Sequence, residues 1–373
     1  MKQGLGQLFW PALAGVLAAI LIIDRWLPSP QPTPAGGPST SYAEAVARAT
    51  PSVVNIYTAK VIRTQPNPML EDFLTRLRLP PQAPRERIER SLGSGVIMTD
   101  EGHILTNNHV IEGADAIQVM LQDGRTANAM VIASDPGTDL AVLKTDLTDL
   151  QPVALGNSDL ARVGDVVLAI GNPLGFGHSV TQGIVSALGR YGLQQNTYED
   201  YIQTDATIHL GNSGGALVNA NGELLGINTL VFTGDRRAVR TIGTGISLAI
   251  PVNLAVFVMD DLIEYGQVVR GWVGISVDPI KYTNPRGEPR LALRVTAVAP
   301  DSPAQRAGVR VGDVITHINN EPVLDLRLAI YRITLIKPGD VVELAATRDG
   351  ESIVFSATVE ALEPVNSLPI EEG

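Results

Sequence analysis

Short runs of β-branched and aliphatic residues recur through the middle of this chain. They lie at residues 95–98, 103–106, 116–121, 129–133, 140–144, 166–170, 180–185 and 217–225. Runs of this length, separated by turn residues, are typical of β-strands, and their spacing leaves no room for a helix between each strand and the next. The pattern therefore predicts an all-β barrel or sandwich rather than alternating strand–helix units.

The segments around these runs are expected to differ. Residues 41–50 form a short predicted helix, because Ser41 and Glu44 have the spacing of a capping box, and Pro51 should end it before a strand at 52–57. Residues 64–91, which include a charged run, read as a long loop inside the domain. Apolar residues at helical spacing predict a helix over 252–265, which Gly266 should stop.

Composition narrows the class of protein. The chain has 373 residues, 45% of them hydrophobic and 18% charged, which describes a globular protein of more than one domain. The net charge of −11 argues against nucleic-acid binding, because no basic surface is available to neutralise phosphates. The chain has no cysteines, so disulfides, a thiol nucleophile and thiolate metal sites are excluded.

The N-terminus predicts export. Residues 4–23 carry no charge, Lys2 precedes them, and Trp26 follows. A stretch of this length can just cross a bilayer as a helix, and the positive start places its N-terminus in the cytoplasm and the body in the periplasm. A cleaved signal peptide is the alternative, but the sequence after Ile23 is a poor cleavage site. The expected organisation is a membrane anchor at 1–26, a Pro/Ser-rich linker at 27–40, the β-rich domain at 41–268, a second domain at 269–362 and an acidic tail at 363–373.

The segment Gly-Asn-Ser-Gly-Gly at 211–215 carries the chemistry. Its glycines can expose the Ser213 hydroxyl and aim the amides of Gly211 and Ser213 at one point, which is the arrangement that acyl transfer requires. The same residues also suit an ordinary turn. A catalytic serine needs a base and a group that orients the base. Among five histidines, His109 follows a strand at a polar turn, and Asp139 lies between a turn and an apolar strand.

The order of His109, Asp139 and Ser213 along the chain is that of chymotrypsin-like barrels. Together with the segments 106–110, 138–142, 169–173, 181–186 and 211–215, it resembles the HtrA family of serine proteases over residues 41–361. The resemblance implies a chymotrypsin-like double β-barrel with His109 as general base, Asp139 as its orienter and Ser213 as nucleophile. The amides of Gly211 and Ser213 would hold the oxyanion, and no metal or cofactor is implied. The family often has Asn-Pro before Gly-Asn-Ser, whereas His209 and Leu210 stand here, so the resting state of the oxyanion hole is left open.

The second domain resembles one PDZ domain of α+β architecture. Its family carboxylate-binding loop corresponds here to Trp272, Val273, Gly274 and Ile275, which would hold the C-terminus of a peptide. A helix is expected over residues 325–335, with Leu326, Ile330 and Ile333 lining either the peptide groove or the domain core. Arg190 matches a family arginine in a regulatory loop that senses the PDZ domain.

A single PDZ domain and an N-terminal anchor resemble the DegS/AlgW branch of the family. That branch implies a homotrimer in the inner membrane, which senses peptide C-termini of misfolded outer-membrane proteins and cleaves a membrane-bound anti-sigma factor. Two alternatives stay open at this point. One is general protein quality control in the periplasm, and the other is a catalytically silent PDZ scaffold that only binds peptides.

Overall fold

The structure, a computed structural model, describes residues 41–64, 85–172, 177–190, 200–209, 211–231, 246–283 and 288–362. The expected membrane anchor, the linker and the acidic tail lie outside these residues. Within the described part of the chain, no helix is both long and apolar enough to cross a membrane.

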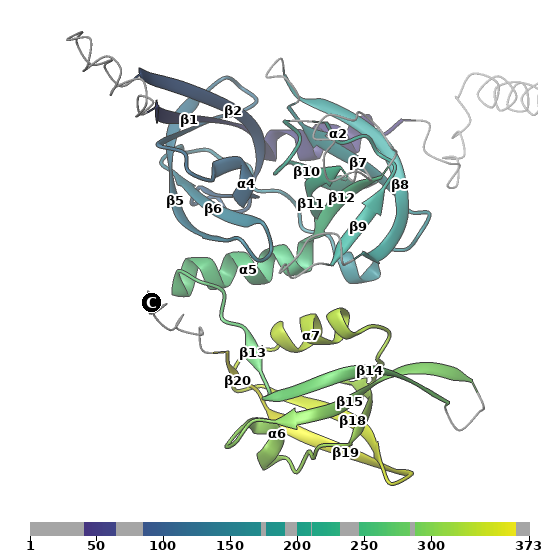
Figure 1. The fold of residues 1–373 in the computed structure, drawn as a ribbon. Coiled ribbons are helices and arrows are strands. Elements are labelled where there is room, and N and C mark those ends of the chain that lie inside the picture. The colour runs from purple at the N-terminus through teal and green to yellow at the C-terminus, as the bar shows by residue number, and fades with distance from the viewer. Residues whose placement is uncertain are drawn as a thin grey trace, which may run out of the picture. The chain divides into compact units, whose positions relative to one another are not determined.

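The first six strands of the described chain form a closed barrel (Figure 1). Its strands follow one another around the barrel in the order β1 (Val53–Thr64), β2 (Arg85–Ile97), β3 (His103–Asn107), β6 (Leu140–Thr145), β5 (Thr126–Asp135) and β4 (Ala116–Met120). The short helix α4 (Asn108–Ile111) follows β3 directly. Alternate aliphatic side chains of these strands, such as Ile56, Ile104 and Leu143, are fully buried and fill the interior. The expected β-barrel is therefore present.

A second closed barrel follows in the chain. Its order is β10 (Ala216–Asn219), β11 (Leu224–Val231), β12 (Ser247–Pro251), β9 (Tyr201–Thr204), β8 (Ser179–Arg190) and β7 (Val166–Gly171). The 3-10 turn η2 (Ser158–Leu160) lies between the barrels in sequence. Helix α5 (Val252–Tyr265) then contacts strands of both barrels, β5 and β6 in the first and β11 and β12 in the second. It ends at Gly266 in a left-handed conformation, as the sequence predicts.

The C-terminal part of the described chain is an α+β domain. The strands β14 (Ile275–Thr283), β15 (Pro289–Val298), β16 (Val314–Ile318), β18 (Val341–Arg348) and β19 (Glu351–Thr358) form one antiparallel sheet, and β17 (Glu321–Pro322) pairs with β16. The short strands β13 (Gly271–Trp272) and β20 (Glu360–Ala361) close the domain. Helices α6 (Pro303–Arg306) and α7 (Leu326–Thr334) complete it, and Asp325 caps α7 by accepting from the Arg327 amide.

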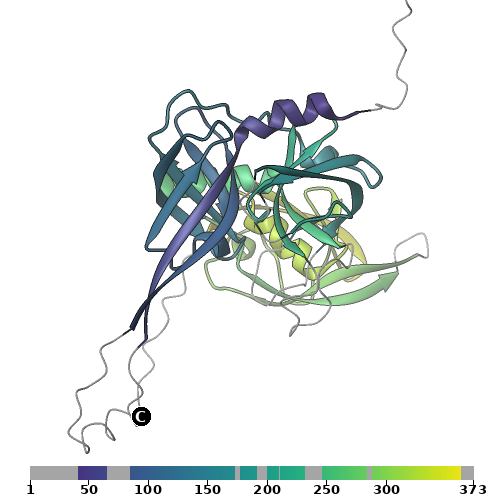
Figure 2. The ribbon, with the colours of Figure 1, turned by 90° about the horizontal axis from the view of Figure 1, so that it is seen from above.

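One local prediction at the N-terminal side is wrong. The charged run that was expected in a loop is part of β2, which pairs with β1 in a long antiparallel hairpin that extends from the barrel (Figures 1 and 2). In that register Lys60 lies opposite Glu89, so the pairing sets unlike charges face to face. The short helix predicted before Pro51 is present as α2 (Ala43–Ala49), and the 3-10 turn η1 (Thr50–Ser52), which tolerates proline in its first turn, joins it to β1.

The single strand expected over 217–225 is also wrong, because it is two strands. Asn219 turns the chain, since its side-chain oxygen accepts hydrogen bonds from the amides of Asn221 and Glu223. Gly222 adopts a positive φ of 79° in the same turn. The Asn221-Gly222 pair is a strong hairpin signal that the strand pattern hid. Strands β9 and β12 were not predicted, because each is short and β12 is buried on both faces, which removes the alternation.

Candidate active site

His109 and Asp139 are paired on the first barrel, just beyond the adjacent strands β3 and β6. The Nδ1 atom of His109 lies 2.7 Å from Oδ2 of Asp139, and the His109 amide donates to Oδ1 at 3.0 Å. A carboxylate only accepts, so Nδ1 carries the shared proton and Nε2 keeps a free lone pair. The Asp139 side chain is 15% exposed and that of His109 is 41% exposed, which leaves the imidazole accessible to a substrate.

The turn that holds Asp139 is fixed by the residues preceding His109. Asp139 has a φ of 58°, a left-handed conformation that Asp and Asn tolerate better than most residues. Its carbonyl accepts from the amide of Asn108 and from the side-chain Nδ2 of Asn107, both at 3.0 Å. The two asparagines before the histidine therefore lock the carboxylate and the imidazole into one unit.

Ser213 lies on the second barrel, in the turn that leads into β10. Its hydroxyl donates to the carbonyl of Thr229 at 2.9 Å. The glycine that follows it has a φ of 81°, and a Cβ atom at Gly214 would lie 2.1 Å from the Ser94 carbonyl oxygen. Only glycine fits there, so the glycine frame lets the serine turn pack directly on β2 of the first barrel.

Thr229 connects Ser213 with the His109–Asp139 pair, and the sequence analysis missed it. Its buried hydroxyl donates to Oδ2 of Asp139 at 2.9 Å, while its carbonyl accepts from the Ser213 hydroxyl. A threonine inside an ordinary β-strand carries no local signal of such a role. Only the approach of β11 to the Asp139 turn brings the three residues together.

The amides proposed to hold an oxyanion are unengaged. Among the residues that the structure describes, the amides of Gly211 and Ser213 donate to no protein acceptor. Gly211 has a φ of 97°, and the neighbouring Asn212 amide donates to the His209 carbonyl at 2.9 Å. His209 thus contributes its backbone to this turn, and Leu210 lies outside the described residues.

Arg190 is the last residue of β8, opposite Tyr201 of β9. Its Nε donates to the side chain of Gln203 at 2.8 Å, so its described contact lies within the second barrel.

The surroundings of Asp200, the residue before Tyr201, shift the pKa of its carboxyl group. Burial, and secondarily the Asp159 carboxylate, raises the pKa of Asp200 to about 6, while Arg332 of α7 acts in the opposite direction. Asp200 is therefore partly protonated near pH 6.

The predicted carboxylate-binding loop joins β13 to β14. The carbonyls of Val273 and Gly274 accept from the amides of Ala304 and Ala299, which ties the loop to the domain beneath it. Gly274 has a φ of 80°, and a Cβ atom there would lie 2.3 Å from Cβ of Ser302. Trp272 pairs with Glu360 and Ile275 begins β14, so the four predicted residues form one tight connection at the start of a strand.

The apolar stripe of α7 divides between two environments. Leu326 and Ile333 pack against the core of the C-terminal domain, whereas Ile330 is 45% exposed. The core reading therefore holds for Leu326 and Ile333, and the groove reading stays a prediction for Ile330.

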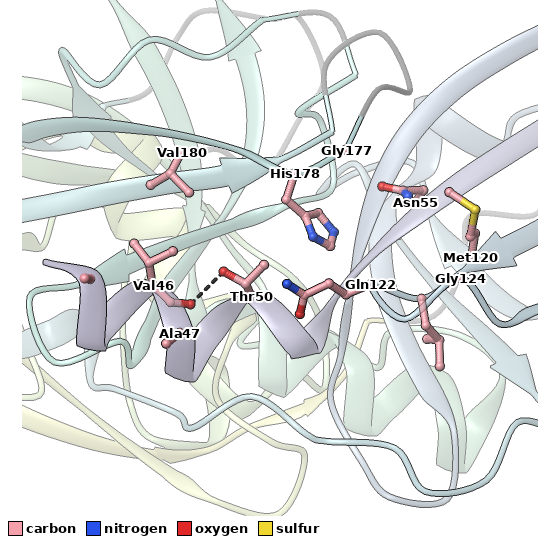
Figure 3. Close-up of a pocket in the computed structure, with 12 residues that line it drawn as sticks. Val46, Ala47, Thr50, Asn55, Met120, Gln122, Gly124, Gly177, His178 and Val180 are labelled. Carbon is pink, nitrogen blue, oxygen red and sulfur yellow. Dashed lines mark hydrogen bonds between the residues drawn. The ribbon is translucent and has the colours of Figure 1, made fainter.

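A pocket of about 520 Å³ lies away from these residues, beside α2 (Figure 3). Its wall includes Val46, Thr50, Met120, Gln122 and His178. Burial lowers the pKa of His178, and a hydrogen bond with the Val53 backbone partly opposes that shift. Ser213, His109 and Asp139 do not line this pocket.

In the described part of the chain, no cluster of three or more His, Asp or Glu side chains could hold a metal ion.

Comparison with known proteins agrees with this geometry. Residues 93–227 match the trypsin-like peptidase domain, and residues 294–348 match the PDZ domain. The chain is 42% identical over 325 residues to the serine endoprotease DegS of Salmonella typhimurium, covering 86% of each chain. It is also 42% identical over 340 residues to a probable periplasmic serine endoprotease, DegP-like, of Pseudomonas savastanoi, covering 85% of this chain and 70% of the relative.

Solved structures give the same result. The HtrA-type protease AlgW with a decapeptide matches with a TM-score of 0.65 and 44% identity, covering 87% of this chain and 99% of the other. A serine endoprotease from Yersinia pestis matches with a TM-score of 0.56 and 40% identity, covering 87% of this chain and 99% of the other.

Proposed function

Because this chain belongs to the HtrA family of serine endoproteases, and is itself a serine endopeptidase with one PDZ domain, we propose that peptide C-termini regulate its cleavage of an envelope substrate. The observation that carries the catalytic part is the position of Thr229. Its hydroxyl bonds Asp139 and its carbonyl bonds the Ser213 hydroxyl, so the serine lies beside the His109–Asp139 pair. The match to the trypsin-like peptidase domain and to serine endoproteases supports an enzyme rather than a silent scaffold.

In the proposed mechanism, Ser213 attacks the carbonyl carbon of a peptide bond. Its hydroxyl first leaves the Thr229 carbonyl and passes its proton to Nε2 of His109 as the new C–O bond forms. Asp139 stabilises the imidazolium through Nδ1, and the amides of Gly211 and Ser213 donate to the oxyanion. The imidazolium gives its proton to the departing amine, and a water molecule, deprotonated in turn by His109, then releases the acyl group from Ser213.

For regulation, we infer that the loop formed by Trp272, Val273, Gly274 and Ile275 captures the terminal carboxylate of a peptide. The peptide would add a strand beside β14, with Ile330 of α7 contacting its side chains. The structure of AlgW with a decapeptide supports peptide binding by a relative of this architecture. Arg190 is proposed as a relay toward the Ser213 turn, because its strand β8 pairs with β9 in the same barrel.

Peptides with free apolar C-termini are expected to raise kcat/KM, and C-terminal amidation should abolish the effect. Loss of charge-assisted hydrogen bonds to the carboxylate should weaken binding by roughly tenfold to a hundredfold. Cleavage assays and fluorescence anisotropy with matched acid and amide peptides measure both quantities. Equal stimulation by the amide would contradict carboxylate capture.

The relay has its own control within this experiment. Arg190→Ala should lose the stimulation yet bind the peptide with unchanged affinity. Arg162→Ala removes another surface arginine, 82% exposed, and should behave like the unaltered protein. Weakened peptide binding by Arg190→Ala would instead make this residue a PDZ contact.

The natural substrate that we propose is a membrane-bound anti-sigma factor, cleaved by a trimer held in the inner membrane through residues 4–23. Support comes from the uncharged run in the sequence and from the DegS relative. Membranes washed with sodium carbonate should retain the full-length protein, and detergent extracts should contain it at the mass of three chains. Release by carbonate would contradict the anchor, and a single-chain mass would contradict the trimer.

General quality control is the second candidate, favoured by the DegP-like relative of equal identity. The two proposals differ in whether cleavage requires an activating C-terminal peptide. Rapid degradation of a generic unfolded protein without any C-terminal peptide favours quality control, whereas peptide-dependent cleavage of one membrane protein favours the stress-sensing role.

A further inference from the structure

Ser94 is a buried serine of β2 that contacts the Ser213 turn through its backbone. It has no exposed surface. Its amide donates to the carbonyl of Ser213 at 2.8 Å, and its own carbonyl accepts from the Thr106 hydroxyl at 2.7 Å. Both sides of this residue are therefore fixed, one to the Ser213 turn and the other to β3.

The Ser94 hydroxyl makes two further hydrogen bonds, and their direction is determined. It donates to the carbonyl of Gly211 at 2.7 Å, because a carbonyl has no proton to offer. It accepts from the amide of Asn172 at 3.0 Å. All three residues are buried, so water does not compete for these bonds, and an unmade bond would leave a buried polar group without a partner.

The Gly211 carbonyl belongs to the peptide unit that separates the two oxyanion amides. The nitrogen of that unit, on Asn212, donates to the His209 carbonyl at 2.9 Å. The peptide is thus held at its oxygen by Ser94 and at its nitrogen by His209. The carbonyl of Ser213, two residues further along the turn, is held by the Ser94 amide. One residue of the first barrel consequently fixes two carbonyls of the turn, those of Gly211 and Ser213.

We propose that Ser94 is a positioning residue for the protease site, whose hydroxyl sets the orientation of the Gly211 carbonyl and so aligns the oxyanion amides with Ser213. This inference rests on the proposed roles of Gly211 and Ser213. The same hydroxyl links the turn to Asn172, whose side-chain oxygen accepts from the Gly177 amide at 3.0 Å. The backbone that follows β7 is therefore connected to the oxyanion turn through one oxygen atom.

The test is the kinetics of Ser94→Ala in the full-length protein, measured with and without a saturating peptide that has a free apolar C-terminus. Removing a whole oxyanion donor costs about a hundredfold to a thousandfold in kcat, so misaligning the donors should lower kcat by roughly tenfold to a hundredfold. KM should stay within about twofold, because ground-state binding is untouched. Binding of a peptide boronic acid, which forms a tetrahedral adduct, should weaken in proportion to kcat, while binding of an uncleaved peptide analogue should not.

Two variants distinguish a positioning role of the Ser94 hydroxyl from a general effect on the stability of the protein. Ser94→Cys keeps a weak donor and should give a kcat between those of serine and alanine. Thr50→Val removes another buried hydroxyl, which donates to the Val46 carbonyl at 2.6 Å (Figure 3), and should lower the melting temperature without changing kcat. The pH profile of kcat/KM should be unchanged in Ser94→Ala, because Ser94 contacts neither His109 nor Asp139.

Equal kcat for folded Ser94→Ala and the unaltered protein would overturn the inference, as would parallel weakening of the boronic acid and the uncleaved analogue. These outcomes differ from a failure of the proposed function. If Ser213→Ala cleaves as fast as the unaltered protein, the nucleophile is wrong, whatever Ser94 does.

Discussion

Replacing Ser213 by alanine is expected to remove peptide-bond cleavage almost entirely. Loss of the nucleophile from a Ser-His-Asp triad costs about a millionfold in kcat, because the remaining groups cannot form the acyl intermediate. The fold should survive, since the lost hydrogen bond to the Thr229 carbonyl contributes only about 1 kcal/mol to the free energy of unfolding. Peptide cleavage and thermal unfolding, measured side by side, test both expectations.

The PDZ domain supplies the internal control for this variant. Ser213→Ala should bind C-terminal peptides with unchanged affinity, which shows that the loss lies in chemistry. Ser352→Ala, at an exposed position of β19, removes a serine hydroxyl elsewhere and should retain full activity. Residual cleavage above a hundredth of the original rate would assign the nucleophile to another residue.

Asp139→Asn is expected to lower kcat by about ten-thousandfold with little change in KM. An asparagine Nδ2 facing His109 would donate to Nδ1, so the imidazole proton would move to Nε2 and the base would be lost. The turn should persist, because asparagine also tolerates the φ of 58° at this position. Steady-state kinetics across the pH range, together with a melting curve, measure the effect.

A matched variant exists for this substitution. Asp149 also has a positive φ, of 52°, but its residue is exposed and it follows β6, ten residues along the chain from Asp139. Asp149→Asn should therefore keep kcat unchanged. A loss below tenfold in Asp139→Asn would show that the imidazole does not depend on this carboxylate for its tautomer.

Much of the architecture follows from local pattern. Short runs of β-branched and aliphatic residues predicted most strands of both barrels. The helix over 252–265 was predicted with its bounds, because five apolar residues and a terminal glycine specify it locally. The wrong or missing strand predictions lie where the residue pattern of a segment does not reveal the strand with which it pairs. Charged residues of β2 look like a loop until β1 lies beside them, and β12 lacks alternation because both of its faces are buried.

Local sequence was enough to predict the three residues proposed for the chemistry: a serine framed by glycines, a histidine after two asparagines, and an aspartate at a turn. Each was recognisable because its backbone requirement is local. The contacts that hold them together become visible only in the folded protein. Thr229 and Ser94 carry no local signal, since a threonine or serine within a strand is common, and their roles arise only where the two barrels bring distant carbonyls within hydrogen-bonding distance. Such contacts depend on how strands meet across a barrel, a relation that no single stretch of sequence encodes.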